Sequence, residues 1–232
     1  SQIKGYLLSD TNNKNLPQKF ELIKYNNNDS YFNHMVNALQ IIEEEFIIYM
    51  QDDYFLIKEP DFVILNQCLK KIKEENLDFV RLIRTGKDQL SNGSIFHKIS
   101  TTSRSLFSTQ PTIWRKSTLI NIIKKGKREY SEGNIWDAEA QLNHISQLDK
   151  VNGYFIYSNE MKRGKNHWDS KFFPYIATAI IKGKWNLKEY QNELLQIFIE
   201  NNVSLIRGFN INNLLDKILL IIRYRFLLLF KK

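Results

Sequence analysis

An apolar run that stops abruptly at two adjacent carboxylates is the strongest constraint in this sequence. Five apolar residues, Phe46 to Met50, are followed by Gln51, Asp52 and Asp53. Five residues are too few for a free-standing helix, so the run predicts a buried strand. Ligands of open α/β sheets bind at the carboxyl ends of strands, where Asp52 and Asp53 would repel each other unless a cation compensated them. Mg²⁺ or Mn²⁺ carrying a phosphorylated ligand fits such a pair, and a solvated turn is the alternative.

Strand-like and helix-like segments alternate along the chain, which is typical of an α/β sheet with helices on its faces. Asn92-Gly93 suits a tight hairpin turn, and Gly126 is expected to end a helix. We expect one domain over residues 1–200. The expected strands are 3–8, 20–24, 46–50, 77–83, 106–114 and 154–158, and the expected helices are 30–42, 60–72, 117–125, 135–145 and 190–200.

The composition is typical of a globular protein, and its net positive charge favours a negatively charged partner. The 232 residues suffice for a packed core, and 33 Lys and Arg against 25 Asp and Glu give a net charge of +8. This excess favours nucleic acid, an anionic membrane surface or a phosphorylated substrate. The single cysteine, Cys68, excludes an internal disulfide and falls on the apolar face of an expected helix, which indicates a core residue. Such cysteine usage is typical of a cytoplasmic protein.

The C-terminal segment, residues 201–232, differs from the rest because it is strongly apolar with interleaved and terminal cations. Arg223 and Arg225 interrupt the apolar run, so we do not expect it to span a bilayer. A basic amphipathic helix lying on an anionic membrane, at its inner face, is the expected structure. The alternative is a helix packed on the domain or on a second subunit.

Two basic segments that contain a glycine are candidates for binding phosphate groups. In residues 162–168, Gly164 lets the backbone approach a ligand, and His167 could add an imidazole to a metal held by Asp53. Residues 182–185 form a second such segment, and for both the alternative is a solvated loop. The cations that would stabilise a diphosphate leaving group are Arg163, Lys165, Lys182 and Lys184.

Two carboxylates, Asp137 and Glu139, follow Trp136 in the first turn of the expected helix 135–145. The helix dipole and the free N–H groups favour negative charge there, which is a sufficient structural explanation. A carboxylate beside an aromatic ring can also bind and deprotonate a sugar hydroxyl. Either residue is therefore a candidate general base, and the sequence alone leaves both explanations open.

Five segments, in this order, resemble those of a group of bacterial and viral glycosyltransferases with a GT-A-type nucleotide-sugar-binding fold. Members carry an L-E-D-Y-F-L-like strand end, a Q-x-x-I-W-R-K segment, a W-[DE]-x-E segment and a late G-K-W. The similarity spans most of residues 3–196 and implies a Rossmann-like, mixed and mainly parallel sheet with helices on both faces. The corresponding segments are 51–56, 110–116, 136–139, 174–176 and 182–185.

Carried over residue by residue, the resemblance implies a donor site with bound Mn²⁺ or Mg²⁺. Asp53 would be the metal carboxylate, and Asp52 would face the metal or the donor ribose. Glu139, or else Asp137, would be the catalytic base. The residues expected to line the cleft between donor and acceptor are Gln110 and Trp114.

The sequence departs from the pattern of that group at two points. Gln51 stands where a D-x-D motif has its first Asp. In addition, such enzymes have a strand–helix unit, in contact with the nucleotide base, ahead of the segment that resembles 3–10. From these departures we expect a donor site that is incomplete, rebuilt by other segments, or lost with a truncated N-terminus.

The resemblance predicts transfer of a sugar from a nucleoside-diphosphate donor to a glycan or lipid-linked acceptor, with inversion, in surface polysaccharide synthesis. A non-catalytic relative that binds a membrane or a partner protein is the first alternative. A nucleic-acid-binding protein, suggested by the net charge of +8, is the second. Because the basic residues are dispersed and no nucleic-acid module is recognised, we do not expect nucleic acid as a partner.

Overall fold

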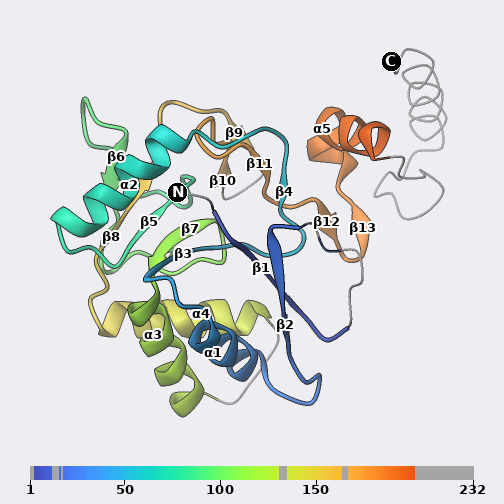
Figure 1. Ribbon diagram of the computed structural model, residues 1–232. Helices are drawn as coiled ribbons and strands as arrows, with labels where there is room; N and C mark the ends of the chain where they lie inside the picture. Colours follow the sequence, from blue (N-terminus) through green and yellow to red (C-terminus); the bar gives the residue numbers. More distant parts are fainter. Residues whose placement is uncertain (1–2, 12–15, 17, 131–134, 164–166, 202–232) are drawn as a thin grey trace.

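A five-stranded mixed sheet forms the centre of the molecule, with helices packed against it (Figure 1). The computed structural model describes residues 3–11, 16, 18–130, 135–163 and 167–201. The strands lie in the order β3-β7-β5-β8-β6. Their bounds are Phe46–Tyr49 for β3, Thr112–Arg115 for β7, Phe79–Arg81 for β5, Gly153–Ile156 for β8 and Phe96–Lys98 for β6.

The expectation of a mainly parallel sheet is wrong for this central sheet. β5 and β8 are parallel, whereas β3–β7, β7–β5 and β8–β6 are antiparallel. The cause is that β7 runs in reverse between β3 and β5, and β6 returns along the outer edge; alternation of strands and helices in a sequence carries no sign of such reversals. Strands β3, β5 and β8 still run in one direction, so their carboxyl ends lie along the same edge of the sheet.

Five helices are present in the described part of the chain, and two of them begin at a side-chain cap. The Ser30 hydroxyl accepts a hydrogen bond from the N–H of Asn33 (3.2 Å), and the Asp61 carboxylate accepts from two N–H groups of the next helix. The helices are α1 (Tyr31–Ile41), α2 (Phe62–Glu74), α3 (Lys116–Glu129), α4 (Ile135–Leu148) and α5 (Leu187–Glu200).

Alternate side chains of the central strands pack into two separate cores, as the two-residue period of a strand requires. One core lies under α1, α3 and α4, and the other lies under α2, which also contains the buried Cys68. The helices on the two sides are visible in Figure 1. The first core takes Phe79, Trp114 and Phe155 from the sheet, and the second takes Val80, Ile113 and Ile156.

Four two-stranded sheets surround this centre, and β3 itself is only half-buried because it lies at the edge of the central sheet. The pair β4–β11 ties the segment after β3 to the C-terminal part of the chain, and α5 packs over a small core of its own. The pairs are β1 (Gly5–Ser9) with β2 (Phe20–Lys24), β4 (Phe55–Leu56) with β11 (Tyr175–Ile176), β9 (Lys162–Arg163) with β10 (His167–Trp168), and β12 (Ile180–Ile181) with β13 (Lys184–Trp185).

Two expectations about turns are wrong. Gly126 does not end its helix: α3 continues to Glu129, and a Cβ at Gly126 would lie 2.8 Å from Cδ2 of Leu142 in α4. This glycine therefore permits close approach of two helices. A turn does form at Asn92-Gly93, but the strand that follows it, β6, pairs with β8 instead of closing a local hairpin.

The expected amphipathic helix of residues 201–232 falls, apart from its first residue, outside the described residues. Among the residues that are described, none of the helices combines the length and the apolar character that crossing a bilayer would need.

Replacement of Gly153 by alanine tests the packing of the central strands. A Cβ at Gly153 would lie 2.3 Å from Cε1 of the buried Phe79 ring, so the ring must move. We expect Gly153→Ala to lower the free energy of unfolding by about 1–3 kcal/mol in urea denaturation. Gly5→Ala is the matched control, because its Cβ would meet the Phe20 ring, which is 45% exposed and can swing into solvent. An equal loss in both variants would contradict this explanation.

Candidate functional site

The two adjacent carboxylates lie in a turn between β3 and β4, at the carboxyl edge of the sheet. The turn is closed by a hydrogen bond from the N–H of Tyr54 to the carbonyl of Gln51 (3.2 Å). Asp52 is exposed, whereas Asp53 is half-buried, and its Oδ1 is buried without a partner among the described residues. Burial and the charge of Asp52 raise the pKa of Asp53 to about 6. Asp53 is thus a carboxylate whose charge lacks compensation.

Tyr54 connects this turn to the segment that precedes β7. Its buried hydroxyl lies 3.4 Å from Oγ1 of Thr109 and accepts a hydrogen bond from Nε2 of Gln110 (2.9 Å). The hydroxyl of Tyr175 donates to Oε1 of the same glutamine (2.5 Å), and the rings of Tyr54 and Tyr175 are 5.6 Å apart. The Gln110 amide is therefore held between two tyrosine hydroxyls beside the acidic turn.

Glu139 lies in the same neighbourhood, on α4. Its Oε1 accepts a hydrogen bond from the N–H of Thr109 (3.1 Å), which fixes the carboxylate next to the residue that contacts Tyr54. Burial raises the pKa of Tyr54, and the charges of Asp53 and Glu139 add to this effect. Both carboxylates thus act on one tyrosine. Asp137, the other candidate base, is exposed.

Two further tyrosines complete the polar cluster, and sequence reasoning did not identify them. The hydroxyls of Tyr31 and Tyr49 lie 3.0 Å apart. Burial raises the pKa of both, and the charge of Glu139 contributes in each case, with Asp52 contributing at Tyr49. For Tyr49, the sequence signal that could have been used is its position in the apolar run that ends at the acidic pair. The sequence around Tyr31 contains no comparable signal.

A cavity of about 310 Å³ adjoins Glu139. Part of its lining comes from the segment around Ser105, which the buried Arg81 holds through hydrogen bonds to the carbonyls of Ser105 (2.7 Å) and Leu106 (2.8 Å). Burial lowers the pKa of Arg81 to about 10, against the opposing charge of Glu139. The lining residues are Arg104, Ser105, Phe107, Glu139, Ala140 and Asn143.

Trp114 and His167 do not join this site. Trp114 is 0% exposed and packs between Phe79 and Phe107 in the core under α1, α3 and α4, so the expectation that it lines a cleft is wrong. His167 is hydrogen-bonded to the hydroxyl of Tyr190 (2.7 Å), and burial lowers its pKa. Within the described ranges no three His, Cys, Asp or Glu side chains are close enough to hold a metal, so His167 is not brought to the acidic pair.

Of the cations expected to bind phosphate, one is paired with carboxylates of the fold and two are exposed to solvent. Arg163 is bound to the carboxylates of Asp169 (3.1 Å) and Glu193 (2.6 Å), so its charge is already matched within the fold. Lys182 and Lys184 are exposed in the β12–β13 hairpin, whose turn takes positive φ angles at Lys182 and Gly183. Lys165 lies outside the described residues.

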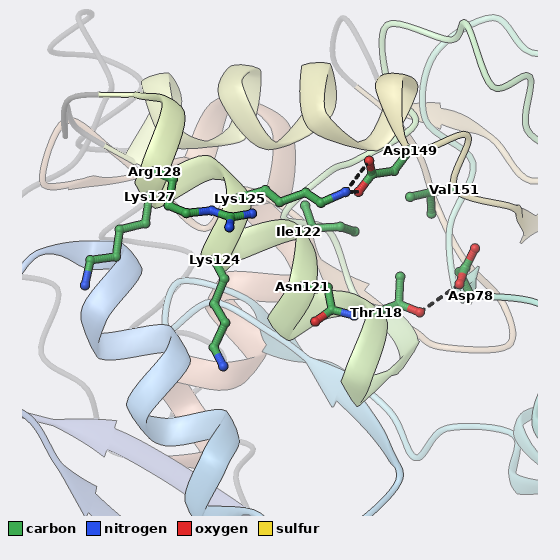
Figure 2. Close-up of a pocket in the computed structure, with 10 residues that line it drawn as sticks. All are labelled: Asp78, Thr118, Asn121, Ile122, Lys124, Lys125, Lys127, Arg128, Asp149 and Val151. Atoms are coloured by element: carbon green, nitrogen blue, oxygen red, sulfur yellow. Dashed lines mark hydrogen bonds and ion pairs between the residues drawn. The ribbon is translucent and has the colours of Figure 1, made fainter.

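A larger cavity, of about 630 Å³, lies against α3 and is lined by several cations (Figure 2). Asp78, which directly precedes β5, borders it, so this cavity is at the amino end of that strand, opposite the edge that carries the acidic pair. Lys125 is paired with Asp149 (2.6 Å), and Asp78 accepts hydrogen bonds from the Thr118 hydroxyl and the N–H of Asn152. Its acidic groups are therefore engaged within the fold.

The residues of the acidic turn fit a divalent ion. Mg²⁺ is typically held by one or two carboxylates and takes its remaining ligands from water and substrate phosphates. Asp52 and Asp53 supply two carboxylates, and the buried Oδ1 of Asp53 has the unmet charge that a cation would satisfy. Gln51, also half-buried, adds a neutral side chain at the start of the turn.

Comparison with known proteins adds no assignment: neither the family models nor the curated proteins give a match to this chain.

The raised pKa of Asp53 predicts how the protein's stability depends on pH. In the folded state this carboxyl titrates near 6 instead of 3.8, so its contribution to the free energy of unfolding is present below pH 4 and is lost as the pH rises through 6. In the absence of divalent ions, the free energy of unfolding of Asp53→Asn, relative to wild type, should therefore be higher at pH 7.5 than at pH 4. The expected difference between the two pH values is about 1 kcal/mol after allowance for solvent screening.

Urea denaturation at both pH values measures this difference. Glu74→Gln, at an exposed position at the end of α2, is the control and should stay within about 0.5 kcal/mol of wild type at both pH values. If Asp53→Asn also differs from wild type equally at pH 4 and pH 7.5, the carboxyl does not titrate as proposed.

Proposed function

We propose that this protein transfers a sugar from a nucleoside-diphosphate donor to a hydroxyl of a glycan or lipid-linked acceptor, in the synthesis of a surface polysaccharide. One observation carries the proposal: Asp53 has a buried and uncompensated carboxylate oxygen at the carboxyl edge of the sheet, and Glu139 acts on the same tyrosine from α4. The ordered motifs that resemble glycosyltransferases support it, because two of their acidic residues, Asp53 and Glu139, lie in this neighbourhood.

The acidic turn is the proposed donor side of the site. Asp52 and Asp53 would hold Mn²⁺ or Mg²⁺, and a divalent ion bound there supplies charge neutralisation for a diphosphate leaving group. The fold supports this placement, since β3 and β5 run in one direction and are joined through α2, as in nucleotide-binding α/β units. We include a GT-A-like, Rossmann-like fold in the proposal on this ground.

Glu139 is the proposed general base. The hydrogen bond from Thr109 orients its carboxylate, and the adjoining cavity of about 310 Å³ gives space for an acceptor. Glu139 would take the proton of the acceptor hydroxyl while the acceptor oxygen bonds to the anomeric carbon and the bond from that carbon to the diphosphate breaks. Direct attack of this kind inverts the anomeric centre. With this setting, the proposal includes a location in the cytoplasm at the inner membrane face.

A nucleotide panel tests the donor site. We expect one of UDP, GDP, CDP or dTDP, with Mn²⁺, to raise the thermal unfolding temperature of the wild-type protein. At about 100 times its Kd, the ligand should add about 2.7 kcal/mol to the free energy of unfolding. Asp53→Asn should abolish the shift and Glu74→Gln should retain it. The absence of a shift with all four nucleotides in the wild-type protein would favour the non-catalytic, partner-binding alternative.

A pair of variants on α4 tests the base. With the donor sugar that corresponds to the nucleotide found, Glu139→Gln should lower kcat for donor turnover by about 10²–10⁴-fold, because the amide keeps the hydrogen bond from Thr109 but cannot accept a proton. The nucleotide-induced thermal shift should remain. Asp137→Asn, on the exposed side, should turn over the donor like wild type. The measurement is nucleotide release in a coupled assay. A greater loss of activity in Asp137→Asn than in Glu139→Gln would contradict the assignment of Glu139 as the base.

A further inference from the structure

Arg84 lies at the edge of the sheet that carries the acidic turn, and the proposed function does not use it. It follows β5, and Tyr157 directly follows β8. Because β3, β5 and β8 run in one direction, both residues lie on the edge where Asp52 follows β3. This is the edge at which α/β sheets bind ligands.

Two aromatic rings hold the Arg84 guanidinium. Its carbon Cζ lies 4.4 Å from the centre of the Trp168 ring and 4.8 Å from that of Tyr157. The Tyr157 ring is fixed by its hydroxyl, which donates to the carbonyl of Glu160 (3.3 Å). The backbone N–H of Trp168 donates to the backbone carbonyl of Arg84 (3.3 Å), which holds these two residues side by side. The orientation of the guanidinium is therefore set before any ligand arrives.

The charge of this guanidinium has no carboxylate partner among the residues that the structure describes. Its Nε is buried and lacks a hydrogen-bond acceptor. Arg163, on β9, differs in this respect because it is paired with two carboxylates. Lys162 lies over the same Trp168 ring at 5.5 Å and adds a second cation. Glu160, the nearby acid, accepts a hydrogen bond from the N–H of Ser158.

We propose that Arg84, held by Tyr157 and Trp168, binds a phosphate group of a ligand that lies along the carboxyl edge of the sheet. A guanidinium stacked on rings presents its remaining N–H donors in its own plane, in the fork geometry that matches two oxygens of a phosphate. Lys162 supplies the additional positive charge that favours a phosphate over a singly charged carboxylate. The proposal does not depend on the sugar-transfer chemistry, because it concerns phosphate binding alone.

Titration of the full chain with inorganic pyrophosphate, without divalent ions, tests this site. In ¹⁵N-labelled protein, the Nε–H resonance of Arg84, identified by its loss in Arg84→Lys, should shift on titration. We expect Arg84→Lys, which keeps the charge but loses the fork, to bind pyrophosphate about tenfold more weakly. Trp168→Leu removes one ring and keeps the arginine, so it should weaken binding by a smaller factor and provides a second test if Arg84→Lys folds poorly.

Arg128→Lys is the matched control, because Arg128 lines the cation-rich cavity on α3 at the opposite edge of the sheet. A loss of binding in Arg128→Lys but not in Arg84→Lys would place the anion on α3 and overturn the proposal. So would acetate binding as tightly as pyrophosphate, or an Arg84 resonance that does not move.

The source of the phosphate is distinguished by two further titrations, with a nucleoside diphosphate and with geranyl diphosphate. If Arg84→Lys weakens binding of the nucleoside diphosphate more, the ligand is a nucleotide. If it weakens binding of geranyl diphosphate more, the ligand is a prenyl-linked diphosphate. These titrations omit metal and use Arg84 variants, whereas the test of the transferase site uses Mn²⁺ and Asp53→Asn, so each proposal can fail without the other.

Discussion

The pairing of β7 with both β3 and β5 is the constraint on which the rest of this structure depends. In the β3–β7 ladder Tyr49 pairs with Thr112, so the last residue of one strand faces the first residue of the other. The acidic turn that follows β3 is thereby placed beside Thr109 and Gln110, which lie more than fifty positions later in the sequence. A parallel β7 would have sent these two segments to opposite edges.

The buried Arg81 gives this arrangement its rigidity at some electrostatic cost. A guanidinium that is 0% exposed loses its hydration, and here it is compensated by one hydroxyl and two backbone carbonyls instead of a carboxylate hydrogen bond. The charge of Glu139 offsets part of that cost from a longer distance. The arginine and the glutamate therefore support each other, which links the stability of segment 104–107 to the residue that we propose as the base.

The sequence allowed prediction of the parts of the fold that depend on local patterns. The strand before Asp52 and the buried Cys68 follow from short-range periodicity. The direction of β7 did not, because a short strand has the same pattern whichever way it pairs. Gly126 was misassigned for a related reason: a glycine permits close packing as well as helix termination, and only the position of Leu142 distinguishes the two.

The candidate site was predictable to a similar extent. The placement of Asp53 and Glu139 in one polar neighbourhood agrees with the motif order. The Trp114 ring, in contrast, lies in the core, because alternate residues of a strand face opposite sides of the sheet and Trp114 faces α1, α3 and α4. Tyr31 and Arg81 were missed because an isolated tyrosine in a helix, or an arginine within an apolar strand, has no sequence signal of its role. The Tyr49 hydroxyl that Tyr31 contacts lies 18 positions away along the chain, and the carbonyls that Arg81 binds lie 24 and 25 positions away.

α5 packs over a small core that is distinct from the two cores of the central sheet. It is tied to the segment after β3 by the short β4–β11 pair, and short ladders of this kind open at a lower free energy than a central sheet. Tyr175 of β11 donates to Gln110 and packs in the core under α2, so it joins this part of the chain to the central sheet. An opening of the β4–β11 pair would therefore disturb the Gln110 amide beside the acidic turn while the five-stranded sheet stays intact.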